Sequence, residues 1–331
     1  MKRFFAVSLV CALLISLASC QRRESGSDGG LNRSAHFVTV LTGPTSGIYF
    51  PIGGAFSSHL RDVGFRTSAT ATGATAENIR FILGGQGEMA IAMSDAVIQA
   101  YQGNGAFEGQ PPASDLRALM GLWPNYVQIV TTEASGIKRF EDLRGKRVGV
   151  GAPNSGVELN ARMMFEAHGM TYADVRVDYL DYGQAIEQIT NGNMDVAFVT
   201  SGLGIATIRE LGATRKVSFV SVEGEGLRRL LQLYPFFVEA TIPKEIYGSA
   251  EDTPTVSIMN IMLISNKLSE DVVYDILENV YSPAGLALIG ASHANAATHI
   301  KPETALRGIY GTVIPFHDGA IKFYRERGMM Q

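Results

Sequence analysis

A strand-like apolar run that ends in a cluster of Gly, Ser and Thr, and then passes into a helix, recurs along this sequence. The first example joins the run Phe37–Leu41 to the loop Gly43–Gly47 and to an amphipathic segment in which Ile52, Phe56 and Leu60 recur at helical spacing. Further junctions of this kind are Thr72–Thr75, Ser94–Asp95, Gly151–Gly156 and Thr200–Gly202. Strands that alternate with helices over the whole length predict an α/β fold with largely parallel sheets.

These junctions also predict a binding site. In open α/β sheets, ligands lie outside the carboxyl ends of the strands, where the following helices begin. The first backbone N–H groups of a helix have no partner within the helix, so they attract carboxylates and phosphates. Pro51 suits the first helical position of its segment, and Thr75 suits an N-cap. Because the junctions fall before and after a boundary near residue 130, we expect two lobes with a ligand cleft between them.

The N-terminal residues have the layout of an export signal. Two basic residues and the apolar run Phe4–Leu17 precede small residues and Cys20, which predicts a signal peptide over residues 1–19. The segment Leu17–Cys20 resembles a bacterial lipoprotein signal, in which the cysteine becomes the lipidated first residue. Cys11 would be removed with the signal, so lipidation also explains why Cys20 has no second cysteine to pair with.

Composition describes the remainder as a folded globular body. Residues 20–35 are polar and rich in Gly and Ser, which predicts a flexible tether. Hydrophobic residues make up 46% of the chain and charged residues 18%, and no later run of 18 apolar residues predicts a membrane span. Without residues 1–19 the chain has 26 basic and 32 acidic residues, a net charge of −6, which argues against a nucleic-acid partner.

The sequence lacks the motifs of several common catalytic and cofactor-binding sites. Gly151–Gly156 lacks the following Lys of a phosphate-binding loop, and Gly149–Asn154 keeps only two of the three dinucleotide glycines. No Ser lies in a G-x-S-x-G elbow, and no two His are spaced as metal ligands. His317 either touches the cleft or belongs to a structural turn. We therefore expect no catalytic residue, metal or cofactor.

Aromatic and acidic residues beside the junctions are the other candidates. Tyr49 and Trp123 adjoin irregular backbone and could cover the apolar part of a ligand. Asp95 either caps a helix or meets an amine or hydroxyl of the ligand.

Five stretches together resemble the TAXI class of solute-binding proteins of TRAP transporters, over about residues 36 to 329. They are Thr42–Gly54, Ala71–Asn78, Met93–Asp95, Asp142–Gly156 and Ile314–Tyr324. The resemblance implies a two-lobed, type II-like periplasmic-binding-protein fold with crossovers at Val127–Thr131 and Phe236–Thr241. Lobe I would comprise residues 36–128 plus 240–331, and lobe II residues 129–239.

The resemblance carries several binding residues onto this chain. With the candidates named above, the predicted ligand-binding set is Gly43, Thr45, Ser46, Gly47, Tyr49, Thr75, Asn78, Ser94, Asp95, Trp123, Ser155, Gly156 and Thr200. The chain departs from the family pattern where Pro44, Ser46 and Ala74 replace glycines and Met93 replaces a Gln.

The resulting hypothesis is a monomeric, non-enzymatic receptor in the periplasm, held to a membrane by a lipid on Cys20. It would capture a small organic anion, dicarboxylate- or glutamate-like, and deliver it to a TRAP permease. One alternative is a ligand-sensing receptor that signals to a membrane sensor protein. Another is an enzyme on the same scaffold, for which no acid–base pair better than Asp95 and a distant His is present.

Overall fold

The computed structural model describes residues 31–153, 155–309 and 311–331. The predicted signal peptide and Cys20 lie outside the described residues. The strands are β1 (Phe37–Leu41), β2 (Arg66–Thr70), β3 (Met89–Met93), β4 (Arg117–Thr132), β5 (Arg147–Gly149), β6 (Arg176–Asp178), β7 (Val196–Ser201), β8 (Val217–Phe219), β9 (Val238–Ile242) and β10 (Thr253–Ile264).

Helices alternate with these strands, as the sequence pattern predicts. The α-helices are α1 (Tyr49–Asp62), α2 (Thr75–Leu83), α3 (Ser94–Gln102), α4 (Gly156–Ala167), α5 (Tyr182–Thr190), α6 (Ala206–Thr214), α7 (Gly224–Leu233), α8 (Lys244–Tyr247), α9 (Glu270–Val280), α10 (Pro283–Ser292), α11 (Ala294–His299) and α12 (Asp318–Glu326). The short 3-10 helices are η1 (Arg33–Ala35), η2 (Gly105–Phe107), η3 (Glu133–Ser135), η4 (Phe140–Leu143), η5 (Tyr172–Asp174) and η6 (Pro302–Thr304).

One mixed sheet of ten strands organises the part of the chain that the structure describes. Its main order is β2-β1-β3-β10-β4-β7-β5-β6, with β8 on β4 and β9 on β10. The α/β class is confirmed, but the expectation of largely parallel sheets is wrong. Parallel pairs occur toward the two ends of the sheet, whereas β10 is antiparallel to β3, β4 and β9, and β4 is antiparallel to β7 and β8.

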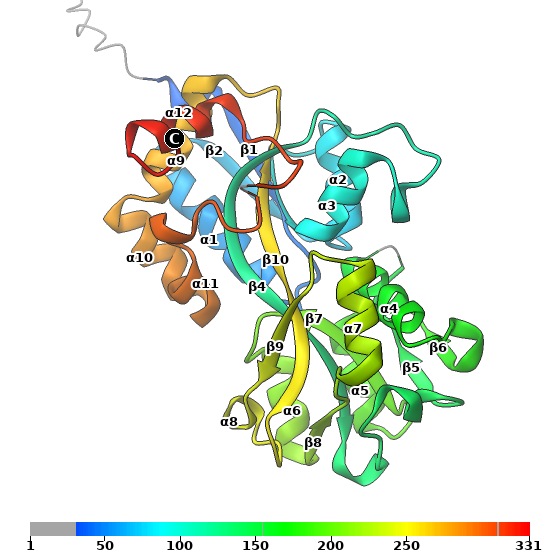
Figure 1. Ribbon diagram of the computed structural model, residues 1–331. Coiled ribbons are helices and arrows are strands. Elements are labelled where there is room, and N and C mark those ends of the chain that lie inside the picture. Colours follow the sequence, from blue (N-terminus) through cyan, green and yellow to red (C-terminus); the bar gives the residue numbers. More distant parts are fainter. Residues whose placement is uncertain (1–30, 154, 310) are drawn as a thin grey trace, which may run out of the picture. The chain divides into compact units, whose positions relative to one another are not determined.

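The two long strands β4 and β10 run through both parts of the sheet (Figure 1). The first part contains β1–β3 with α1–α3 and α9–α12, and the second contains β5–β9 with α4–α8. The sequence pattern predicts two strands interrupted at Trp123–Tyr126, but β4 is continuous. Pro124 is tolerated because β10 changes register between Met259 and Ile261, where a strand can accept a residue without an N–H.

Apolar helix faces form the core on the sheet. In α1, Ile52, Phe56 and Leu60 are fully buried, at the spacing that the sequence predicts. The same pattern places five apolar residues of α9 in the core: Val272, Val273, Ile276, Leu277 and Val280. Among the described residues, no helix combines the length and the hydropathy that a membrane crossing requires.

Several helix starts differ from those that the sequence predicts. Helix α1 begins at Tyr49, so Pro51 is its third residue rather than its first, still among the N–H positions that lack a helical partner. Ala74, not Thr75, is the N-cap of α2. The cluster Thr200–Gly202 does not open a helix directly, because Thr200 is still in β7 and α6 starts only at Ala206.

The last residues of the predicted tether do not behave as a tether. Arg33 lies in η1, and its guanidinium donates to Asp275 of α9 and to the carbonyl of Val63. These long-range bonds attach residues 33–35 to the folded body. The second predicted crossover, Phe236–Thr241, is also misplaced, because the strand at that position, β9, pairs with the first half of β10 and does not continue into the first part of the sheet.

Candidate functional site

The starts of four helices meet at one small cavity between the two parts of the sheet. The first residue of each helix lines it: Tyr49 of α1, Thr75 of α2, Gly156 of α4 and Tyr182 of α5. Its remaining lining residues are Pro44, Gly47, Ile48, Ala74, Met93, Val157 and Ser201. Met93 immediately precedes α3, so a fifth helix start adjoins the cavity. Each helix brings the positive end of its dipole and its unpaired N–H groups, which favours an anionic group here.

The cavity is small because the two parts of the molecule touch. Its volume is about 20 Å³, which is room for about one water molecule. A Cβ atom added to Gly156 would lie 2.0 Å from Met93 Cε and 2.9 Å from Thr75 Oγ1. A Cβ on Gly47 would lie 3.3 Å from the ring of Tyr182. The glycines therefore permit close contact, and the structure is a closed conformation.

Tyr49 links the cavity to the long strands. Its hydroxyl donates to Asn260 Oδ1 of β10 and accepts from Asn125 Nδ2 of β4 at 3.2 Å. Asn125 Nδ2 also donates to Asn260 Oδ1 at 3.0 Å. This buried network joins the start of α1 to the place where β10 changes register. Burial raises the pKa of the Tyr49 phenol above its usual range, so the phenol remains neutral.

Trp123 does not line the cavity, contrary to its predicted role as a ligand wall. It is fully buried, and its indole N–H donates to Asn125 Oδ1 at 3.1 Å. The Trp123 ring packs edge-to-face on Tyr49 with 5.8 Å between centroids. The indole therefore lies in the core, where it supports Tyr49.

The other predicted residues of the first two loops also lie apart from the cavity. Thr45 is exposed, and Gly43 is buried beside Ala74 and Tyr49. Ser46 is half-buried, and its hydroxyl has no hydrogen-bond partner in the structure. Asn78 instead links the backbone after β1 to β3. Its Nδ2 donates to the carbonyls of Thr42 and Ile91, and its Oδ1 accepts from Thr72.

Residues of the later loops have defined local roles. Ser155 caps α4, because its Oγ accepts from Glu158 N at 3.2 Å. Thr200 is buried in β7, and its carbonyl accepts from Tyr182 Oη at 2.6 Å while its hydroxyl has no partner. Ser94 is a buried first residue of α3. His317 belongs to a structural turn: its Nδ1 accepts from Gly319 N, and its Nε2 lies 3.1 Å from the carbonyl of Leu268.

Asp95 contacts the second part of the molecule. Asn160 of α4 donates from Nδ2 to Asp95 Oδ2 at 2.7 Å, and both side chains are fully buried. Burial raises the pKa of Asp95 to about 6, although backbone N–H groups and Asn160 act in the opposite direction. Neither residue lines the small cavity.

Sequence reasoning missed residues that matter here. Tyr182 looks like an ordinary core aromatic in the sequence, yet its ring lines the cavity. Asn125, Asn160 and Asn260 show no motif, because isolated amides in apolar segments are not a binding signature. Their one sequence signal is that each is a polar residue in a segment whose pattern predicts burial, where a hydrogen-bond partner is required.

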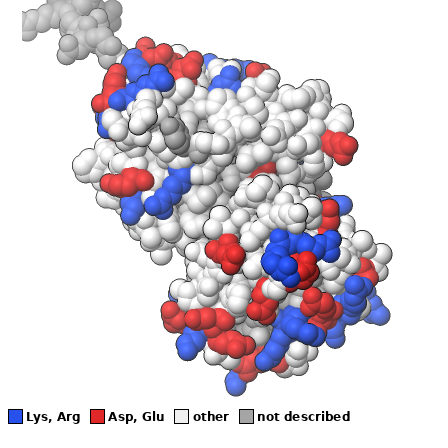
Figure 2. Space-filling view, in the orientation of Figure 1, with Lys and Arg blue, Asp and Glu red and all other residues white. Residues whose placement is uncertain are grey.

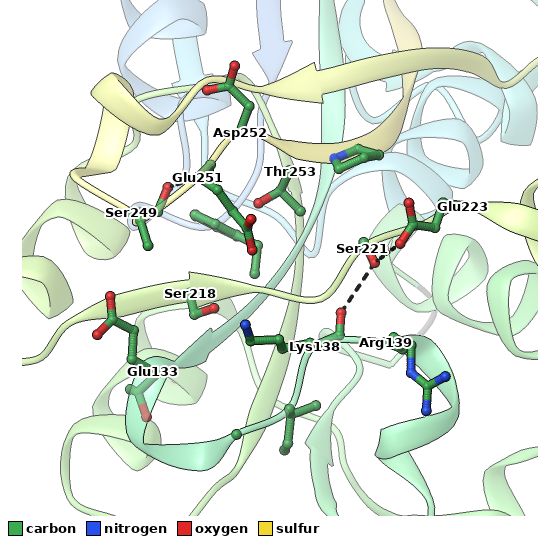
Figure 3. A pocket seen from close by; sticks show the side chains of 16 residues that line it. Glu133, Lys138, Arg139, Ser218, Ser221, Glu223, Ser249, Glu251, Asp252 and Thr253 are labelled. Atoms are coloured by element: carbon green, nitrogen blue, oxygen red, sulfur yellow. Dashed lines mark hydrogen bonds between the residues drawn. The ribbon is translucent and has the colours of Figure 1, made fainter.

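Larger hollows lie elsewhere on the described surface. One of about 710 Å³ is formed by the η3–η4 region, β8 and the turn before β10, and its rim carries charges of both signs, including Glu133, Lys138, Arg139, Glu251 and Asp252 (Figure 3). Another, of about 730 Å³, lies between α3, the end of α7 and residues 311–313. Both are open grooves, and the first residue of an α-helix lines neither of them. Figure 2 shows acidic and basic side chains interspersed on the visible face.

Comparison with known proteins places this chain in a family. Among solved structures, a protein from Bordetella bronchiseptica RB50 is 14% identical, with a TM-score of 0.52 over 88% of this chain and 98% of that one. The periplasmic aliphatic sulphonate binding protein SsuA from Escherichia coli is 12% identical, with a TM-score of 0.44 over 88% of each chain. A binding protein component of an ABC phosphonate transporter from Pseudomonas aeruginosa is 13% identical, with a TM-score of 0.47 over 78% of each. The model of the NMT1-like family matches residues 40–328, so the chain belongs to the NMT1-like family.

Proposed function

We propose that this protein is a solute-binding receptor that captures a small organic anion between two lobes and delivers it to a membrane permease. The observation that carries the proposal is the meeting of the first residues of α1, α2, α4 and α5 at one cavity. Two of these helices come from each part of the sheet. A bound carboxylate would therefore satisfy N–H groups on both parts at once, and a conformation closed around the ligand, with more room than the present cavity, would gain the differential affinity.

The ligand must enter through an open conformation. A cavity of about 20 Å³ has no room for a dicarboxylate, so the contact between Gly156 and Met93 has to separate on binding. The hinge would lie in β4 and β10 near Asn125 and Asn260, where the ladder between them is irregular. Lobe I would begin at residue 36, and the chain would first pass into lobe II near residues 128–129. It would return to lobe I within β10, near Asn260, rather than at residues 239–240.

The type of permease is a finer proposal. The resemblance of the stretches Thr42–Gly54 and Ile314–Tyr324 to TAXI proteins supports a TRAP-type permease and a dicarboxylate- or glutamate-like ligand. Export and lipidation at Cys20 would place the receptor in the periplasm, attached to a membrane. Cys20→Ser should release the protein from the membrane fraction, and its retention there would contradict the anchor.

Identification of the ligand tests the central proposal. Purified protein is denatured, released small molecules are identified by mass spectrometry, and each is returned to the stripped protein in a thermal-shift assay. We expect an organic anion that raises the melting temperature. Recovery of only neutral or cationic molecules, with no stabilisation by any carboxylate in a panel, would refute anion capture.

Two glycine variants test whether the ligand binds at the cavity. Gly156→Val should abolish the ligand-induced shift, because its side chain would occupy the contact with Met93 and Thr75. Gly54→Ala is the control, since no atom lies within 4 Å of the added Cβ. It should retain the full shift. Equal shifts in both variants would place the ligand elsewhere.

A further inference from the structure

A carboxyl–amide contact joins the two parts of the molecule outside the cavity. Asp95 is in the first turn of α3, and Asn160 is in the second turn of α4. The Nδ2–Oδ2 distance is 2.7 Å, and neither side chain has exposed surface. The contact therefore forms only when the two parts are closed on each other.

Two oxygens of this pair have no hydrogen-bond donor. Asp95 Oδ1 and Asn160 Oδ1 are both buried and unpartnered. Asp95 Oδ1 is the second oxygen of the carboxyl group, and Asn160 Oδ1 is the single oxygen of the amide, whose nitrogen is already in the contact. Two buried acceptors without a donor are costly for an ionised carboxylate, and burial outweighs the backbone N–H groups at the start of α3 that favour the charged form. A carboxylic acid has the missing donor: a protonated acid and a primary amide can exchange O–H···O and N–H···O bonds.

Few charged groups surround Asp95. The elements in contact with α3 include β3, β10 and η2, which contain no charged residue, and α2. On α2, Glu77 accepts from Gly73 N, and Arg80 is exposed. On α4, Glu158 and Arg162 pair with each other, and Glu166 accepts from Tyr234. Tyr49 is a further titratable neighbour, and the charge of Asp95 contributes to raising the pKa of the Tyr49 phenol.

We propose that Asp95 and Asn160 form a proton-binding site that closes with the molecule: a neutral carboxylic acid paired with an amide in the closed conformation, and an ionised, hydrated carboxylate in the open one. Between about pH 4 and pH 6, where the open state is ionised and the closed state is protonated, each closing event takes up a proton. Acidification favours closure, and alkalinisation favours opening.

The direction of this pH dependence follows from the linkage between proton binding and closure. Burial in the closed conformation raises the pKa of Asp95 to about 6, whereas an exposed Asp titrates near 4. A raised acid pKa means that the closed state binds the proton more tightly. The stabilisation of the closed state by this proton is complete below about pH 4 and is lost as the pH rises through about 6. Two pKa units correspond to about a hundredfold change in the ratio of closed to open protein.

Carboxyl NMR measures this site directly in the wild-type protein. With ¹³C at the Asp carboxyl carbons, we expect one resonance to titrate near pH 6, and to be absent in Asp95→Asn. Titration of every Asp carboxyl below pH 5 would overturn the proposal. This measurement uses no ligand, so its outcome is separate from the test of anion capture.

Small-angle X-ray scattering tests the coupling to closure. The wild-type radius of gyration should increase between pH 5 and pH 8. Asp95→Asn keeps the shape of the acid and supplies an N–H donor toward Asn160, so it should stay closed at both pH values. Asp115→Asn, at an exposed position, should behave like wild type. Identical pH responses of wild type and Asp95→Asn would overturn the coupling.

Discussion

Ala74 has a backbone conformation that an alanine rarely adopts, and relieving it should stabilise the protein. Its φ is +69° and its ψ is −147°, and it is the only non-glycine among the described residues with positive φ. This region is essentially restricted to glycine, because a Cβ collides with the adjacent backbone. The residue lines the cavity and is the N-cap of α2. In the TAXI proteins that the sequence resembles, a glycine is usual at this position.

The expected gain of Ala74→Gly is the strain minus the added freedom of the unfolded chain. Strain in such a region costs about 1 to 3 kcal/mol. A glycine loses about 0.4 to 1 kcal/mol more conformational entropy on folding than an alanine. The net increase in the free energy of unfolding is therefore between about 0 and 2.6 kcal/mol, which corresponds to a melting temperature up to about 4 °C higher for a chain of this size.

Urea unfolding and differential scanning calorimetry would measure this change. Ala287→Gly is the matched control, because Ala287 is exposed within α10 and has ordinary helical geometry. The same substitution should there lower the free energy of unfolding by about 1 kcal/mol. If Ala74→Gly destabilises the protein as much as Ala287→Gly does, the argument from strain is refuted.

Three other substitutions test the packing around the cavity and the start of the folded body. Gly156→Ala should lower the free energy of unfolding by about 1 to 3 kcal/mol, because the added methyl group overpacks the contact. In urea unfolding, Met93→Ala in the same chain should restore part of that loss. If it restores none, Met93 is not the side chain that obstructs the added methyl group. Tyr49→Phe should cost about 0.5 to 1.5 kcal/mol, because Asn260 Oδ1 loses one of its two buried donors. An unchanged urea midpoint would contradict the network. Arg33→Ala should lower stability by no more than about 1 kcal/mol, because its ion pair is partly exposed, and a larger loss by calorimetry would show that residues 33–35 contribute more than this pair.

Local patterns predicted much of the fold. The spacing of apolar residues in α1 identified its buried face. The continuous course of β4 was not predictable, because Pro124 usually interrupts a strand. It is accommodated only by the register change in β10, more than 130 residues away in the chain.

The sequence predicted in outline that helix starts would meet, whereas the binding of a ligand there stays a prediction. Gly47, Tyr49, Thr75 and Gly156 lie together at the cavity, as the junction pattern suggests. Asn78 and Trp123 lie near that region but are engaged with backbone and core. A residue type and its place beside a loop do not reveal which way a side chain points, because that depends on neighbours from other elements.

The sequence by itself determined where helices start after strands, because capping, glycine conformation and apolar periodicity act within a few residues. Only the tertiary structure decided that four of those starts face one another and that the space between them is nearly closed. It also decided that Asp95 meets Asn160, 65 residues away, without water. Such pairings depend on how β4 and β10 place the two parts of the sheet, and no local rule encodes the distance between residues so far apart in the chain.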